Sequence, residues 1–600
     1  MTQLQPAHPS VSLPGIPLRR VLGGALATYA ILVTFLAIRQ LDYINADFVG
    51  YATIARRIFQ RQGAENLITG CWSPLFSWCM VPFLALGVGD LVAGRWVLIL
   101  GGTLYLLAAY GITSRFHGPD SRRNLLLTAG LLTCAVLQAA QWATAMLNPD
   151  MLAAGLLYLC LYLLLDPKLP SRPGRAMLTG LVAGLAYLAK AYMLPYLIVL
   201  IPLTLLLRRL FTPPIQISNL KSQISDPRSQ IPHPPIQHSE CGGDSIQHSI
   251  RTLILSLVGF ALVASPWIVV LSTHYHRFTY STAGSSNHAN VSPDNFGNDP
   301  MWHQGLLRDF IADPYFAPDW SAFQDLPHLL HQARVFVYNA RNAAGHSAPW
   351  LILPVGAAAY LWRAQRRRPR QSGPLLSAQD RLGICWGLLA AAVYAGGYCM
   401  VDIQARYFLA VIAPLLGLAG LLMILAVPAG HSPPAPMART WYHSVPAAIV
   451  LVALFSSQDI FRMERIAVQH PQSVELRRYR TISGSLRAAN LPPGPFAATN
   501  YHAGLYLAYA WDRLPSYLGA PLPDNAAEMM KQLQASEARI YLRWFNPQTT
   551  AAQLSPAEAF VPTAPWESVL TIRDITPRGV PMQVNAYVLP SVPALTSNHP

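Results

Sequence analysis

Long apolar segments recur through the first three quarters of this 600-residue chain, and they constrain its fold more than any other feature. A helix needs about 20 apolar residues to cross the roughly 30 Å hydrocarbon core of a bilayer. Only 12% of the residues are charged, whereas a soluble protein carries about 25%, so the composition excludes a disordered chain and argues against a soluble enzyme. The candidate spans are 21–39, 74–88, 91–112, 124–142, 151–165, 177–207, 251–271, 348–362, 383–401, 406–427 and 444–457. The sequence therefore predicts a mainly α, polytopic membrane bundle of about 11 transmembrane helices.

The basic residues orient this bundle, because Lys and Arg are enriched in cytoplasmic loops. The net charge of +15 is spread between the apolar runs, which does not favour nucleic-acid binding. Arg19 and Arg20 precede the first span, which has no small-residue cleavage site and reads as an uncleaved anchor with its N-terminus inside. The arginines of 363–370 and the stretch from Arg208 to 251 are likewise predicted to be cytoplasmic.

Two further basic loops, 113–123 and 166–176, conflict with strict alternation, which places them outside. The conflict disappears if 74–88 only dips into the outer leaflet and 177–207 is a broken pair of helices. A local override of the charge rule is the alternative, and the sequence leaves both open. Either solution places the loops 40–73 and 272–347 and the tail after residue 457 on the outer face.

Two regions differ in character from the predicted transmembrane domain, residues 1–457. Residues 212–250 repeat the short motifs PPIQ and IQHS and have little to bury, so they are predicted to be a disordered cytoplasmic insertion. Residues 458–600 contain compact apolar runs separated by a helical stretch near 524–536, which predicts a small extracytoplasmic α/β domain. This domain has no nucleophile elbow, phosphate loop or metal motif, which favours a lid or docking module.

The first outer loop holds the first candidate for chemistry. Apolar residues at 44, 48, 51, 55 and 58 share one helical face, which predicts an amphipathic helix in the outer interface with Tyr51 on that face. Asp47 lies in its first turn, where a carboxylate can deprotonate an acceptor hydroxyl or hold a divalent cation. The alternative is that Asp47 or Asn45 only caps the helix.

Two further ionisable residues lie in or beside apolar segments. Asp150, which follows Pro149, stands within one turn of hydrocarbon, where a carboxylate is costly and is a functional candidate unless it caps a helix. Lys190 lies in the middle of 177–207 and needs a carboxylate, a phosphate or a snorkelling route to the interface. If the segment is broken near Pro195, Lys190 faces the break.

Candidate substrate contacts lie later in the chain. Arg406 and Tyr407 open a long apolar helix from the outside, and an Arg at a helix N-terminus, which the helix dipole disfavours, indicates a bound anion such as phosphate. Pairing of Arg406 with Asp402 is the alternative. In the loop 272–347, Asn287 and His288 stand in a run of small polar, aromatic and amide residues that suits a sugar site, although any long exposed loop has a similar composition.

The order of these motifs resembles the GT-C glycosyltransferases over roughly residues 20–430, particularly protein O-mannosyltransferases, lipid A aminoarabinose transferases and lipopolysaccharide-core transferases. The series runs from the acid on the first-loop helix through Trp72-Ser73-Pro74-Leu75, Pro149-Asp150, Leu188-Ala189-Lys190, Pro266-Trp267 and the outer-loop Asn287 to Arg406-Tyr407. Each motif is short and degenerate, and the ordered set is more specific than any member.

The resemblance implies a bundle of about eleven to thirteen transmembrane helices, with interfacial helices in the first outer loop, in a bacterial inner membrane. It implies transfer of a sugar from a polyprenyl-phosphate donor to a glycan, lipid or protein hydroxyl on the outer face, with inversion. By the same resemblance Asp47 and Asp150 match functional acids, and Arg406 and Tyr407 match the pair near the donor phosphate. In the mechanism that follows, Lys190 is a second cation that can stabilise the leaving phosphate beside Arg406.

The chain departs from the family pattern at two places. Gln404 stands where family members often carry Glu, and the first loop has one acid in place of a paired motif. Both departures weaken the case for a bound divalent cation, for which Asp47 is the one candidate ligand. A non-catalytic envelope protein on the same fold and a lipid or solute transporter remain the alternatives.

Overall fold

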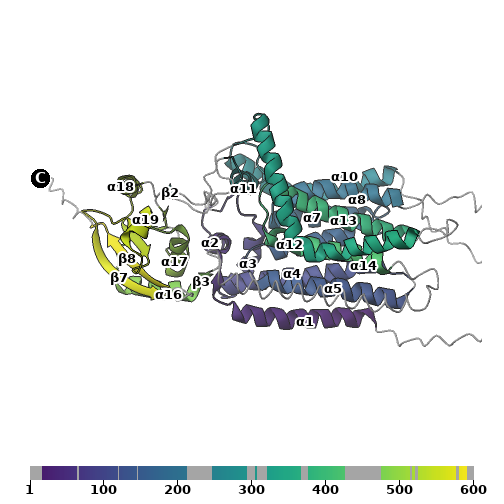
Figure 1. Cartoon of the computed structure of the whole chain (residues 1–600), viewed down its shortest axis with the longest axis horizontal. Helices are drawn as coiled ribbons and strands as arrows, with labels where there is room; N and C mark the ends of the chain where they lie inside the picture. Colours follow the sequence, from purple (N-terminus) through teal and green to yellow (C-terminus); the bar gives the residue numbers. More distant parts are fainter. Residues whose placement is uncertain are drawn as a thin grey trace, which may run out of the picture.

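The computed structural model describes residues 17–63, 67–118, 120–144, 146–211, 246–293, 305–306, 320–366, 376–425, 474–513, 516–520, 525–575 and 580–590. Figure 1 shows an elongated bundle of helices with a smaller domain of mixed helices and strands at one end. The expected span at 444–457 lies outside the described residues.

Within the described residues, six helices are long and apolar enough to cross a membrane, so the chain is an integral membrane protein. They are α1 (Leu18–Arg39), α4 (Asp90–Ser114), α5 (Ser121–Thr144), α8 (Met193–Phe211), α10 (Ile246–His274) and α13 (Ala378–Cys399). The bundle also contains α3 (Leu75–Ala85), α6 (Asp150–Leu164), α7 (Pro173–Ala189), α12 (Leu326–Arg366) and α14 (Ala405–Leu425). The fold is thus the expected helical bundle, but the expected number of spans is not established.

The two features that reconcile the basic loops 113–123 and 166–176 with the positive-inside rule, a short segment at 74–88 and a break in 177–207, are both present. The helix α3 has 11 residues, which is roughly 16 Å and too short to cross the hydrocarbon core. The segment 177–207 is divided into α7 and α8, and the break falls at residues 190–192 rather than near Pro195, which lies inside α8.

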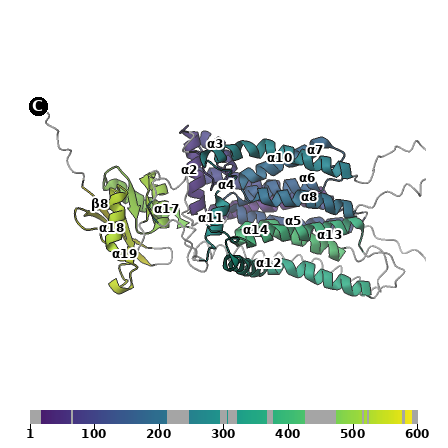
Figure 2. The same cartoon turned by 90° about the horizontal axis from the view of Figure 1, so that it is seen from above.

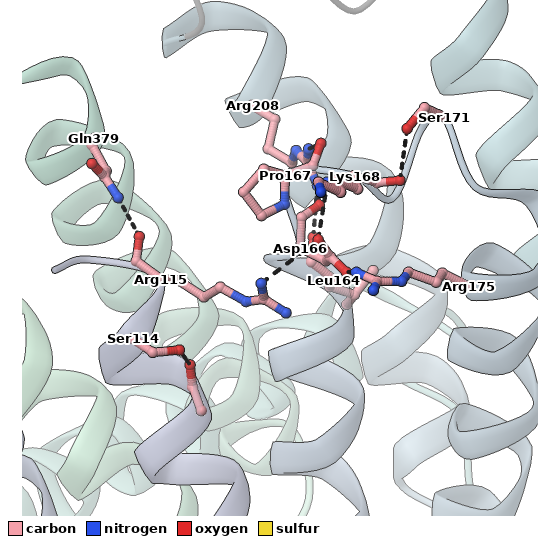
Figure 3. Close-up of polar contacts among 11 residues, drawn as sticks. Ser114, Arg115, Leu164, Asp166, Pro167, Lys168, Ser171, Arg175, Arg208 and Gln379 are labelled. Atoms are coloured by element: carbon pink, nitrogen blue, oxygen red, sulfur yellow. Dashed lines mark hydrogen bonds and ion pairs between the residues drawn. The ribbon is translucent and has the colours of Figure 1, made fainter. Parts of the chain in front are cut away.

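With these breaks, the loops 113–123 and 166–176 lie together at the end of the bundle that is opposite the small domain (Figure 1). Figure 3 shows how they are joined: Asp166 forms an ion pair with Arg175 and lies 3.6 Å from Arg115, measured from Oδ1 to Nη1. Arg208 at the end of α8 donates hydrogen bonds to the carbonyls of Leu164 and Asp166, and Gln379 donates to the Arg115 carbonyl. The early basic loops therefore share one end with the cluster that begins at Arg208.

Close helix contacts in the bundle depend on glycine. A Cβ added at Gly180 of α7 would collide with the Ser256 carbonyl of α10, and one at Gly155 of α6 would collide with the Gly101 carbonyl of α4. Small residues let helix backbones approach closely, which is how membrane helices gain packing energy without a hydrophobic driving force.

The expected boundaries shift at two places. The helix α10 begins at Ile246, so the last five residues of the expected disordered insertion are helical, while residues 212–245 lie outside the described part. The expected outer loop 272–347 contains α11 (Ala283–Ala289) and the short strand β2 (Gly305–Leu306), and its last part is the beginning of α12. Apolar runs alone could not reveal this, because the first turns of α12 are amphipathic.

The small domain contains a four-stranded sheet in the order β4-β6-β8-β7. The strands β4 (Phe496–Ala498) and β6 (Ile540–Phe545) are parallel, and β8 (Pro581–Val588) pairs antiparallel with β6 and with β7 (Glu567–Ile575). Its helices are α16 (Leu476–Ala488), α17 (Tyr501–Trp511), α18 (Ala526–Ala535) and α19 (Pro556–Ala559), and β3 (Val474–Glu475) and β5 (Gly519–Ala520) form two-residue pairs. The compact apolar runs of this part of the sequence, 495–499, 540–544 and 584–589, coincide with β4, β6 and the second half of β8, and the expected helix near 524–536 is α18.

Candidate active site

Two ion pairs lie at the end of the bundle that faces the small domain. The Arg406 guanidinium at the start of α14 contacts the Asp47 carboxylate of α2 (Ala46–Phe59), with 2.9 Å between Nη1 and Oδ2. Lys190, at the break between α7 and α8, forms an ion pair with Asp150 at the start of α6. Since a buried charge without a partner is costly, each pair neutralises what would otherwise be an unfavourable charge.

The Asp47 carboxylate can pair with Arg406 because a different side chain, that of Asn45, caps the helix α2. The Asn45 side chain accepts a hydrogen bond from the Phe48 N–H at 2.9 Å, which makes Asn45 the N-cap of α2. On the other side, the Asp402 carboxylate accepts a hydrogen bond from the Gln404 amide at 3.0 Å. Asn45 and not Asp47 therefore caps the helix, and Arg406 forms its ion pair with Asp47 and not with Asp402.

The ion pair between Lys190 and Asp150 is arranged in a similar way. The Asn148 side chain accepts the Asp150 N–H at 3.3 Å, so the Asp150 carboxylate is available to Lys190. Lys190 has an extended backbone just after the last turn of α7, and its ammonium points inward, 4.3 Å from the centre of the Tyr407 ring. Snorkelling of Lys190 to the membrane surface is therefore wrong.

Tyr407 connects the two pairs. The Arg406 Nη2 donates to the Tyr407 hydroxyl at 3.1 Å, and the guanidinium carbon lies 4.9 Å from the ring centre. The same ring faces the Lys190 ammonium and stacks on Tyr398 with 5.3 Å between centroids. Two cations thus converge on one aromatic ring, which stabilises each of them through a cation–π interaction.

A cavity of about 390 Å³ lies between these groups, within the range of small-ligand pockets. Six of the eight candidate residues line it: Asp47, Tyr51, Asp150, Lys190, Asn287 and Tyr407. Arg406 lies directly behind the wall, bonded to Asp47 and Tyr407. Side chains from the first loop, from the α7–α8 break and from the start of α14 therefore share one cavity.

His288 is the candidate that the structure places elsewhere. Its Nε2 lies 2.8 Å from the Gln332 side-chain oxygen, and its ring stacks on Trp320 with 4.3 Å between centroids. Consecutive residues of a helix point in directions about 100° apart, so His288 turns away from the cavity that Asn287 lines. The prediction that His288 belongs to a substrate-binding wall is not supported by its position.

Several lining residues were not singled out from the sequence as site residues. Tyr398 contacts both Tyr407 and Tyr192, whose ring is 4.0 Å away, and the Ser73 hydroxyl accepts the Ala191 N–H at 3.0 Å, which fixes the backbone just after Lys190. Tyr residues near the end of a span are typical of any membrane interface, so their sequence context carried no site signal. Ser73 belongs to the Trp72-Ser73-Pro74 motif, and that motif was the available signal.

The donor set does not fit a divalent cation. Within the described part of the chain, no three His, Cys, Asp or Glu side chains converge on one point. Asp47 and Asp150 each face a cationic side chain, so a metal ion would have to displace a guanidinium or an ammonium. The chemistry considered below therefore uses no metal ion.

The small domain holds the first loop from outside. The strand β1 (Tyr43–Ile44) pairs antiparallel with β3, and the Leu476 N–H donates to the Asp42 carbonyl at 2.7 Å. The Asp42 carboxylate lies 2.9 Å from Arg477 and 2.9 Å from Arg480 on α16. These contacts fix the chain just before α2 begins.

The same domain also packs on α2 itself, which Figures 1 and 2 show between the bundle and α17. The Tyr506 hydroxyl is hydrogen bonded to the backbone of Ala46, the residue before Asp47. At the other end of α2, Arg56 contacts Asp512 at 3.2 Å. Burial lowers the pKa of His502 on α17, and the nearby Asp47 carboxylate opposes that shift, so His502 lies within electrostatic range of the site.

We expect Tyr506→Phe to loosen the start of α2. The substitution removes the partner of a backbone group at a helix N-terminus, where amides lack partners within the helix, and losing one such bond costs about 1 kcal/mol. Amide hydrogen exchange of Ala46 and its neighbours should become about fivefold faster. Tyr587→Phe in β8 is the control, and equal exchange at the start of α2 in both variants would contradict the role of Tyr506.

No family model matches the chain, and no curated protein is similar to it in sequence at a significant level. Among solved structures, ArnT from Cupriavidus metallidurans bound to undecaprenyl phosphate is similar with a TM-score of 0.49 and 14% identity, over 95% of this chain and 97% of that one. The archaeal oligosaccharyltransferase AglB from Archaeoglobus fulgidus, in complex with an inhibitory peptide and a dolichol-phosphate, has a TM-score of 0.47 and 10% identity, over 88% of this chain and 69% of that one.

The arabinofuranosyltransferase AftD from Mycobacteria is similar with a TM-score of 0.48 and 12% identity, over 95% of this chain and 40% of that one. At identities of 10–14%, each of these similarities is one of fold alone.

Proposed function

We propose that this protein is a membrane glycosyltransferase that moves a sugar from a polyprenyl-phosphate carrier to an acceptor hydroxyl. The observation that carries the proposal is the meeting of Arg406, Lys190 and Asp47 around one cavity at the end of a membrane bundle. Two cations suit a phosphate, and a carboxylate beside them suits a hydroxyl that must lose its proton. The resemblance of the ordered motifs supplies the donor class.

The placement of two cationic side chains beside the cavity favours phosphate binding. Arg406 and Lys190 are each paired with one carboxylate and both lie against the Tyr407 ring, so a phosphate that enters the cavity has a guanidinium and an ammonium within reach. A donor whose lipid tail stays in the bilayer presents its phosphate at this level. When the sugar–phosphate bond breaks, the leaving phosphate gains negative charge, and fixed cations stabilise that transition state more than the ground state.

Asp47 provides the base. The acceptor oxygen attacks the anomeric carbon while the bond from that carbon to the phosphate oxygen breaks, and the acceptor proton passes to the Asp47 carboxylate. Attack on the face opposite the phosphate inverts the anomeric centre. Asp150 keeps Lys190 charged and in place, and Tyr51 and Asn287 line the wall where the hydroxyls of the sugar or of a glycan, lipid or protein acceptor fit.

The positive-inside rule orients the site. The basic loops are joined at Asp166 together with Arg208 (Figure 3), at the end of the bundle opposite the small domain (Figure 1). Cytoplasmic loops carry the excess of Lys and Arg, so the cavity and the small domain belong on the extracytoplasmic side. A donor that is already charged with its sugar when it reaches this face requires no nucleotide site.

The donor role of Arg406 can be tested in membranes supplied with a labelled polyprenyl-phosphate sugar. Arg406→Gln removes a charged hydrogen-bond donor worth about 1.5–3 kcal/mol, so kcat/KM for the donor should fall roughly 10- to 150-fold. Arg381→Gln, on the exposed side of α13, is the control and should leave donor use unchanged. Unchanged dependence on donor concentration in Arg406→Gln, at equal protein level and Tm, would refute the phosphate role.

A further inference from the structure

The first five turns of α12, residues 326–345, form a segment that we call the α12 arm. Figures 1 and 2 show that this arm crosses the long axis of the bundle, whereas the remainder of α12 runs along the bundle beside α13 and α14. The arm projects from the side of the bundle near the end that carries the small domain. An element in this position lies parallel to a membrane surface when the bundle spans the membrane.

The inward stripe of the arm is polar at two of its positions. Gln332 and Asn339 are 5% and 4% exposed, and they share this stripe with Val335 and Ala343. The Gln332 amide donates to the Met400 carbonyl at 2.8 Å, and the Asn339 amide donates to the carbonyls on either side of that residue at 3.2 Å. Amide side chains are thus used to bind the backbone that leads to Arg406.

The outward face of the arm is apolar instead of polar. Leu326, Leu330 and Val337 are 65%, 61% and 66% exposed and recur at i, i+4 and i+11, which places them on one side of the helix. The same arc contains further exposed large side chains at Leu329 and Phe336. A helix that faces water has the opposite arrangement, with its apolar stripe inward and its polar residues outward.

The charged edge of this apolar face, and the residues that continue it along α12, indicate that lipid covers the face. At 100° per residue, Arg334 and Arg341 fall together on one edge of the apolar arc, where cations meet lipid headgroups. Beyond the arm, the same helix continues with exposed Ile352, Val355 and Trp362 along the side of the bundle. The apolar face of the arm is therefore continuous with the membrane-facing side of the protein.

We propose that the α12 arm lies in the membrane interface on the side of the small domain, with its apolar face among the acyl chains and with Arg334 and Arg341 at the level of the lipid phosphates. This placement is independent of the proposed transferase activity, because it rests on exposure, polarity and the direction of the helix alone. As a consequence, the membrane-bound arm positions residues 399–401, which precede Arg406, through the hydrogen bonds of Gln332 and Asn339.

The test places single spin labels on the full-length protein in lipid nanodiscs, on a background in which the exposed Cys385 and also Cys241 of the 212–250 insertion are replaced by Ser. Labels at Leu330→Cys and Val337→Cys should be several-fold more accessible to oxygen than to a water-soluble nickel chelate, as at Val355→Cys. Val569→Cys, an equally apolar exposed position on β7, is the matched control and should show the reverse preference.

Nickel accessibility at Leu330 and Val337 equal to that at Val569 would overturn the proposal, because the face would then be in water. Strong spin–spin broadening at the two arm positions would also overturn it, because it would show that a second copy of the chain covers the face. Neither readout depends on sugar transfer, so a wrong assignment of the reaction cannot be mistaken for a wrong placement of the arm.

Discussion

Asp47→Asn should reduce sugar transfer by about 10²- to 10⁴-fold, the range of a general base, while leaving the fold intact. The amide is nearly isosteric with the carboxylate, and its oxygen can still accept a hydrogen bond from Arg406. The helix α2 keeps its N-cap, because Asn45 supplies that bond. Loss of transfer would therefore report the missing proton acceptor and not a disordered first loop.

The measurement uses membranes with equal amounts of each variant, a labelled lipid-linked sugar and the native acceptor fraction. Asp512→Asn is the control, because this exposed carboxylate pairs with Arg56 at the other end of α2, and it should keep the rate within about twofold, as expected for a surface ion pair. Full transfer by Asp47→Asn would remove this carboxylate from the mechanism.

The elements of the site were predictable where the signal is local. Apolar residues at helical spacing around Asp47 defined α2, and an acid or a Lys in an apolar context marked Asp150 and Lys190 as residues in need of a partner. The break between α7 and α8, where Lys190 lies, belonged to one of the two explanations that the sequence left open for the basic loops. The short helix α3 is the other part of that explanation.

The pairings could not be predicted, because they join residues that are distant in the chain. Arg406 had a carboxylate four residues before it, yet it meets Asp47 from the first loop, and Lys190 meets Asp150 across two helices. His288 and Asn287 looked equivalent in the sequence, and only the direction of α11 separates them. The α12 arm was hidden within an expected outer loop because its polarity is inverted relative to that of a surface helix.

A double-mutant cycle on Lys190 and Asp150 should separate the stabilising role of this pair from its role in donor binding. Lys190→Met alone leaves the Asp150 carboxylate buried without a partner, which should cost about 3–5 kcal/mol of stability and lower Tm markedly. The double variant Lys190→Met/Asp150→Leu removes both charges and should recover most of that loss, because a buried ion pair is often replaceable by packed apolar side chains.

Sugar transfer by the double variant, once its stability has returned, then shows whether the Lys190 ammonium acts on the donor. If Lys190 stabilises the leaving phosphate, stability returns but transfer does not, whereas a purely structural pair would return both. Arg123 and Asp380, which form a similarly buried ion pair at the opposite end of the bundle, provide the matched cycle. Arg123→Met/Asp380→Leu should restore stability and transfer together, because that pair is remote from the cavity. Restoration of transfer in both double variants would leave Arg406 as the cation that acts on the donor and would limit Lys190 to holding the α7–α8 break against α6.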